Sequence, residues 1–155
     1  MIQHLAELNV GRIRYPLDDA RMAGFVDNLE LVNGLAERSE GFVWRLKDDS
    51  GNATSIHAFD DPRIILNLSV WDSVEALERY VWQTVHKRFY GRRHEWFDKM
   101  EGPYFVMWWV PVSHRPTAQE AVERLQRLKQ DGPSEFAFGW ESLPSAQLWK
   151  TSRCA

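Results

Sequence analysis

Apolar residues alternate with polar or small ones near the start of the chain, which predicts a β-strand. Ala6, Leu8 and Val10 alternate with Glu7, Asn9 and Gly11. The same kind of reading predicts strands over residues 5–12, 42–46, 53–59, 64–71, 104–110 and 136–140. The segments 64–71 and 104–110 are apolar on both faces, so each is expected to be covered on both sides.

Apolar residues recur every three or four positions between these strands, which predicts three helices. One has its stripe from Met22 to Leu35, one begins at Asp72 or Ser73 and runs to about Met100, and one opens at the capping box Thr117–Glu120. The second predicted helix carries apolar residues on opposite sides, so a bend is expected near 84–87.

The order of these elements predicts an α+β fold, a ferredoxin-like split βαβ antiparallel sheet with helices on one face. Its other face would be apolar, so a second copy packing sheet to sheet is expected to cover it, giving a homodimeric α+β barrel. Residues 1–141 are predicted to form this single domain, and 142–155 a polar, frayed C-terminal tail.

Composition narrows the classes of partner. The 155 residues carry a net charge of −3, which provides no electrostatic footprint for nucleic acid. The chain contains no long uncharged apolar run, so no membrane span is expected. A single cysteine, Cys154, precludes an internal disulfide and fits a reducing cytoplasm. Eight Trp residues favour cores, interfaces and flat ligand pockets alike.

Polar residues inside the apolar strand 64–71 indicate a small pocket. Asn67 and Ser69 interrupt this strand, and the helix that follows carries Trp82, His86, Tyr90 and Arg93 along one side. His86 is either a neutral histidine bonded to a backbone carbonyl or to Asn67, or a general base or haem-iron ligand.

Two asparagines and one arginine have open interpretations. Asn9 and Asn67 are expected on neighbouring strands, where their amides bond either each other or a ligand carbonyl. Arg45 either clamps a carboxylate from inside the pocket or lies at an edge or dimer interface, and Arg93 has the same two interpretations.

Metal, nucleotide and hydrolase chemistry are not supported. His86 and His94 lie about 12 Å apart along a helix, too far to share one ion. There is no Cys pair, no Gly-rich phosphate loop and no nucleophile elbow. His114 falls in a linker and is expected to be solvated.

Several strings resemble a family of unknown function catalogued as domain 3291. They are Asn67-Leu-Ser-Val-Trp71-Asp-Ser-Val-Glu-Ala-Leu77, His86, Arg92-Arg93-His94-Glu95-Trp96-Phe97, Trp108-Trp109-Val-Pro111 and His114-Arg-Pro-Thr…Gly132-Pro133. The resemblance covers about residues 4–140. It implies the dimeric α+β barrel superfamily, which includes antibiotic-biosynthesis monooxygenases and haem-degrading enzymes. The latter use an Asn, a Trp and a His at positions similar to Asn9, Trp71 and His86.

The protein is therefore expected to have a small-molecule pocket. It is expected to be a monooxygenase-like or isomerase-like enzyme that acts on a small aromatic or conjugated substrate. His86 would be the acid–base group, and Asn9 and Asn67 would hold a developing oxyanion. Trp71, Trp82, Tyr90, Arg93 and Trp108 would bind the substrate. The alternatives are a non-catalytic binder or sensor, a haem-binding or haem-degrading protein, and a structural dimer. The sequence requires no particular cofactor.

Overall fold

A long first strand forms the centre of the molecule. The computed structural model describes residues 2–47, 59–100, 102–146 and 148. In it, β1 (Gln3–Ile13) pairs with β3 (Ile64–Trp71) on one edge, and β2 (Phe42–Arg45) lies beyond β3. The other edge of β1 pairs with β5 (Phe105–Pro111) and, further along, with β4 (Phe97–Asp98). All of these pairings are antiparallel, so the described strands form one five-stranded antiparallel sheet.

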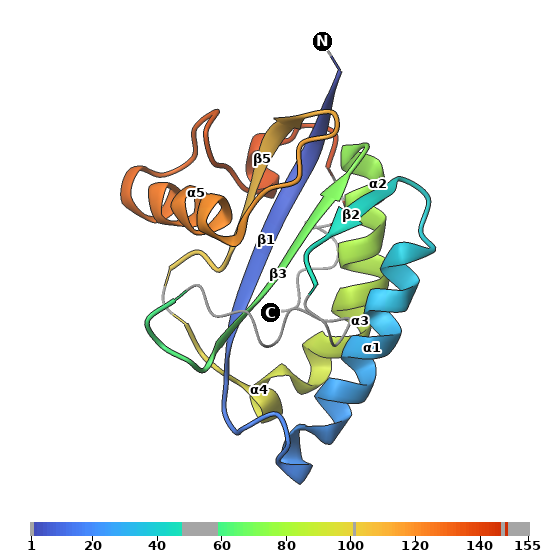
Figure 1. The fold of residues 1–155 in the computed structure, drawn as a ribbon, viewed down its shortest axis with the longest axis vertical. Coiled ribbons are helices and arrows are strands. Elements are labelled where there is room, and N and C mark those ends of the chain that lie inside the picture. Colours follow the sequence, from blue (N-terminus) through green and yellow to red (C-terminus); the bar gives the residue numbers. More distant parts are fainter. Residues whose placement is uncertain (1, 48–58, 101, 147, 149–155) are drawn as a thin grey trace.

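Helices cover one face of this sheet. They are η1 (Ala20–Met22), α1 (Ala23–Glu37), and a nearly continuous rod of α2 (Val74–Arg79), η2 (Tyr80–Val85), α3 (His86–Phe89), η3 (Tyr90–Arg92) and α4 (Arg93–Trp96). Ser73 caps this rod by accepting a hydrogen bond from the Ala76 backbone N–H, as the sequence predicts. Figure 1 shows α1, α2 and α3 together on this side.

The rod has a π-helical turn at η2, which widens the backbone up to the first residues of the predicted bend at 84–87. It also ends earlier than predicted. Phe97 has extended backbone angles and pairs with Ile13, so the chain leaves the helix at Trp96 rather than near Met100. Gly11 makes room for this change, because a Cβ there would lie 2.8 Å from the Phe97 ring.

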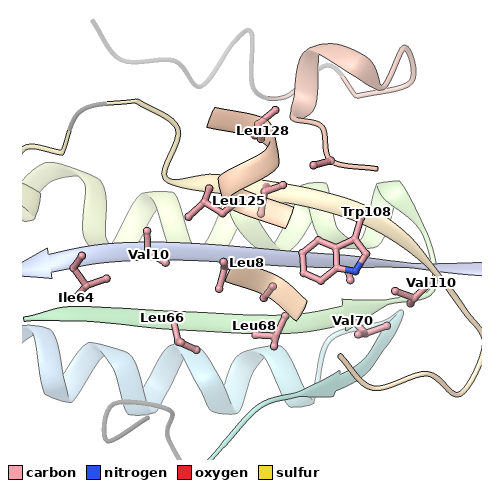
Figure 2. Packing of buried hydrophobic residues seen from close by; sticks show 14 residues of the cluster. Leu8, Val10, Ile64, Leu66, Leu68, Val70, Trp108, Val110, Leu125 and Leu128 are labelled. Atoms are coloured by element: carbon pink, nitrogen blue, oxygen red, sulfur yellow. The ribbon is translucent and has the colours of Figure 1, made fainter. Parts of the chain in front are cut away.

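The expectation that helices occupy only one face is wrong. Helix α5 (Ala118–Asp131) packs on the opposite face, where Leu125 joins Leu8, Val106 and Trp108 in one apolar cluster (Figures 1 and 2). The even-numbered residues of β3, such as Leu68, lie on that face and are buried within a single chain. The apolar second face therefore does not require a partner copy, and the prediction of a homodimer loses that support.

The C-terminal part of the described chain also differs from expectation. The strand predicted over 136–140 is a single bridge between Phe138 and Met107, followed by η4 (Trp140–Ser142). Leu143 and Ala146 are buried against the helical face, where a frayed polar tail was predicted. The weak strand predicted over 53–59 lies, except for residue 59, outside the described residues. No described helix is long and apolar enough to cross a membrane.

Candidate small-molecule site

A polar band crosses the middle of the helix-facing side of the sheet. Glu7 and Asn9 come from β1, and Ser69 and Asn67 lie directly opposite them on β3. On this face the band separates an apolar cluster around Leu5 and its neighbours from a second cluster around Ile13. Four polar side chains between two apolar clusters are costly unless they bond one another or a ligand.

Glu7 is the most buried member of this polar band, with 1% of its surface exposed. Its Oε1 accepts from Ser69 Oγ at 2.6 Å, and its Oε2 accepts from Asn9 Nδ2 at 3.1 Å. Ser69 Oγ in turn accepts from Trp71 Nε1 at 2.9 Å. Burial raises the pKa of Glu7 to about 7, although both hydrogen bonds oppose the shift. Glu7 therefore changes charge near neutral pH.

Asn9 and Asn67, which we call the amide pair, are neighbours across the sheet as predicted. They do not bond each other, because the Asn9 amide nitrogen is turned to Glu7. Within the described residues the Asn67 side chain makes no hydrogen bond. Both asparagines keep partial exposure although they lie in central strands. The amide pair can therefore offer hydrogen bonds to a molecule that approaches from solvent.

The rod brings together four of the predicted site residues in one series of neighbouring planar groups, which we call the ring ladder. The Arg93 guanidinium lies 3.6 Å from the centre of the Tyr90 ring, and Tyr90 stacks on His86 with centroids 4.3 Å apart. The next ring is Trp82, 5.3 Å from His86. Helical spacing of three and four residues produces this series.

Two residues outside the predicted site continue the ring ladder to the sheet. Trp82 lies 6.0 Å from Trp140, and Trp140 stacks on Phe105 at 5.4 Å with an interplanar angle of 16°. Phe105 is the β5 residue directly opposite Asn9. A continuous series of neighbouring side chains therefore connects His86 on the rod to the amide pair on the sheet.

Two nitrogen atoms in the ring ladder are buried without a hydrogen-bond partner. They are Trp82 Nε1 and His86 Nε2, on neighbouring rings. Burial, together with the positive charge of Arg93, lowers the pKa of His86, so its imidazole is neutral at pH 7. A neutral imidazole and an indole N–H can together donate to and accept from a polar ligand.

Trp71 and Trp108 do not join the ring ladder. Trp71 faces the helices, but its ring is stacked on that of Tyr80 with centroids 4.9 Å apart. Its Nε1 donates a hydrogen bond to Ser69 of the polar band. Trp108 points to the α5 side, where its Nε1 donates to Glu120 at 2.9 Å. Trp108 lies on the face opposite the polar band, so its predicted role in this pocket is wrong. In β5 the residues facing the helices are Phe105, Met107 and Trp109.

Arg45 lies beside Ser69 on β2, and its side chain is 9% exposed. Its guanidinium pairs with Glu37 of α1 at 3.6 Å, so the structure places it at the β2 edge between sheet and helix. His114, predicted to be solvated, has its Nε2 2.8 Å from Glu120 Oε1.

Sequence reasoning missed Glu7, Phe105 and Trp140. Alternation alone places Glu7 on the polar, outward side of its strand, yet both faces of β1 are covered. The sequence could have indicated its burial, because Glu7 and Asn9 lie on the same side of the strand as the apolar residues Leu5 and Ile13, both of which are buried.

Two surface hollows lie away from the polar band. One, of about 420 Å³, lies between β5 and the start of α5 near Trp109, His114 and Glu120; the other, of about 310 Å³, lies along β2 near Arg45 and Arg115. Neither includes His86, whose ring is stacked on Tyr90 and tilted against Trp82. Within the described part of the chain, no group of three or more His, Cys, Asp or Glu residues could hold a metal ion.

The fold and site define an α+β protein with a polar, aromatic-lined patch between its sheet and its helices. Residues 4–154 match the family model described as a domain of unknown function (DUF3291), so the chain belongs to this family. No curated protein and no solved structure matched the chain.

Proposed function

We propose that this protein binds a small, planar, conjugated molecule between the rod and the helix-facing side of the sheet. The observation that carries the proposal is the adjacent pair of buried, unpartnered nitrogens, Trp82 Nε1 and His86 Nε2. Buried polar atoms in native proteins nearly always have partners, and a ligand with one donor and one acceptor would supply both. The edges of the rings in the ring ladder would give such a ligand an aromatic wall.

The amide pair supports the same site from the sheet. Phe105 lies next to Asn9, and Asn9 and Asn67 are both partly exposed. Sites for small molecules typically combine mostly apolar walls with a few well-placed polar groups. The π-helical turn that carries Trp82 is also a feature found often at functional sites.

A ferredoxin-like fold in the α+β barrel superfamily is part of this proposal. The order β2-β3-β1-β5, with every neighbour antiparallel, supports the split βαβ arrangement. A homodimer and a cytoplasmic location remain predictions from the sequence.

Native mass spectrometry of the gently purified protein tests the binding directly. We expect an extra mass of a small molecule, and Trp82→Phe and His86→Phe should each weaken its retention by roughly 2- to 10-fold, the worth of one hydrogen bond. Both changes keep an aromatic ring in the ladder and remove its nitrogen atoms, and Trp82→Phe also shortens the ring system. Trp109→Phe, on half-exposed Trp109 outside the ladder, is the matched control. Equal retention by all three variants would refute this site.

A second candidate function is proton transfer on a ketone whose enolate is conjugated with an aromatic ring. The lowered pKa of His86 favours it, because a neutral imidazole with an unpaired nitrogen can accept a proton at pH 7. The indole N–H of the neighbouring Trp82 would then donate to the enolate oxygen. Deuterium exchange into 2-tetralone, followed by NMR, should be faster with the protein than without it. His86→Phe should remove the acceleration and Trp109→Phe should not; acceleration that survives His86→Phe would exclude His86 as the base.

A further inference from the structure

The bonds around Glu7 fix the position of every proton near it. Trp71 Nε1 donates to Ser69 Oγ, so the Ser69 hydroxyl hydrogen is free to point to Glu7 Oε1, 2.6 Å away. Among the described residues Ser69 Oγ has no other acceptor. Glu7 Oε1 is therefore held as an acceptor, and a proton added to Glu7 must go to Oε2.

Glu7 Oε2 is the oxygen that faces Asn9. When Glu7 is ionised, Asn9 Nδ2 donates to Oε2 and the Asn9 carbonyl oxygen Oδ1 is left for another partner. When Oε2 carries a proton, an O–H and an N–H would point at each other. The Asn9 amide then has to turn by about half a revolution, so that Oδ1 accepts from Glu7 and Nδ2 faces outward.

We propose that Glu7 is the positioning residue that sets the specificity of the ligand site, by deciding whether Asn9 presents a hydrogen-bond acceptor or a hydrogen-bond donor. With Glu7 ionised, the site selects planar ligands that carry an N–H or O–H group. With Glu7 protonated, it selects ligands with a ring nitrogen or carbonyl oxygen. This inference rests on the proposed ligand site and adds the chemical class of its ligand.

Glu7 itself does not touch the ligand. Its side chain is buried and both of its oxygens are used. Since burial places the pKa of Glu7 at about 7, the two states of Asn9 would interconvert within the physiological range.

The other charged and titratable groups near Glu7 lie on the rod, on β2 and on α1. Burial raises the pKa of Tyr80, the nearest such group on the rod, far above neutrality. Arg45 on β2 pairs with Glu37 of α1, and Glu78 of α2 accepts from the Leu148 backbone N–H. The facing residue on β5 is Met107, which does not titrate.

Two bicyclic probes of similar size test the inference. Indole offers an N–H donor, and quinoline offers a ring-nitrogen acceptor. Their dissociation constants would be measured by NMR titration at pH 6 and pH 8.5 on the wild-type protein and on Glu7→Gln. The uncharged amide that Glu7→Gln introduces can donate to Asn9 Oδ1, as protonated Glu7 does.

In the wild type, the preference for indole over quinoline should fall by at least about fivefold between pH 8.5 and pH 6, the worth of roughly one hydrogen bond. Glu7→Gln should prefer quinoline at both pH values, with no pH dependence. Glu123→Gln, on the exposed side of α5, should behave as the wild type. A preference that is independent of pH in the wild type would overturn the inference and leave the proposed binding site standing.

A second readout needs no variant and no ligand. The side-chain amide resonances of Asn9 should move with a midpoint near pH 7, while those of Asn67, which does not contact Glu7, should move much less. Equal movement of both amides, or of neither, would overturn the inference. Failure of both probes to shift any resonance of the ring ladder would overturn the binding site, and this specificity with it.

Discussion

Trp108 donates a hydrogen bond from Nε1 to Glu120 Oε2 over 2.9 Å, and this bond connects β5 to α5 on the sheet face opposite the polar band. Trp108 is completely buried, and the other oxygen of Glu120 lies 2.8 Å from His114. The carboxylate of Glu120 therefore joins the strand, the following turn and the first turn of the helix.

Removing this carboxylate should loosen α5. Glu120→Ala leaves the Trp108 indole N–H buried without a partner, so the free energy of unfolding should fall by about 1–3 kcal/mol. Urea denaturation would measure the change. Glu123→Ala, three residues further along the exposed side of α5, should cost less than about 0.5 kcal/mol. A similar loss in both variants would mean that the bond to Trp108 contributes little.

Glu7 should make the free energy of unfolding fall as the pH rises, which is the opposite of what most carboxyl groups do. Its pKa is about 7 in the folded protein and 4.5 in an ordinary exposed carboxyl, so between these values the unfolded chain releases a proton that the folded protein keeps. The contribution of Glu7 is fully present below pH 4.5 and is lost as the pH rises to about 7, by roughly 3 kcal/mol.

The measurement compares unfolding free energies of the wild type and Glu7→Gln at pH 5, 6, 7 and 8. The difference between the two proteins should change steadily up to about pH 7 and then level off. Glu30→Gln, on the exposed side of α1, should give a difference that is flat across this range. A flat difference for Glu7→Gln as well would show that Glu7 titrates as an ordinary carboxyl.

Gly41 should tolerate no side chain. Its φ is +87°, and a Cβ there would collide with the Ala76 Cβ and lie 2.7 Å from Asp72 Oδ1. Strain and overpacking together should make Gly41→Ala lose about 2–5 kcal/mol. Gly91→Ala is the control, because nothing lies within 4 Å of a Cβ at that position and stability should stay level or rise by up to about 1 kcal/mol. Thermal melts of both variants decide the point, and equal melting temperatures would contradict it.

The titration of His86 should respond to Arg93. Burial is the main cause of its lowered pKa and the charge of Arg93 adds to it, so Arg93→Gln should raise the pKa of His86 without returning it fully to the ordinary value of 6.5. NMR of the imidazole protons would follow the change. Arg88→Gln removes an equally charged side chain from the exposed side of the same helix and should shift the pKa less. If the pKa of His86 shifted more in Arg88→Gln than in Arg93→Gln, Arg93 would not be the charge that lowers it.

The sequence alone determined the local features of this protein. Period-two alternation located β1, and the helix caps at Ser73 and Thr117 form where the residue types require them. The ring ladder from Trp82 to Arg93 also followed from the sequence, because helical spacing fixes which side chains lie next to one another. These features depend on residues a few positions apart, so a single stretch of chain specifies them.

The tertiary structure decided what lies on each face of the sheet. β3 and β5 carry apolar residues on both faces, so alternation could not show that Trp108 faces α5 while Trp71 faces the rod. The bond between Glu7 and Ser69 joins residues 62 positions apart, and it exists only because antiparallel pairing aligns β1 with β3. Burial of the Glu7 carboxyl, which moves its pKa, results from α1 and the rod closing over that pairing. Sequence periodicity records which residues avoid water, whereas the packing of distant elements determines which of them meet.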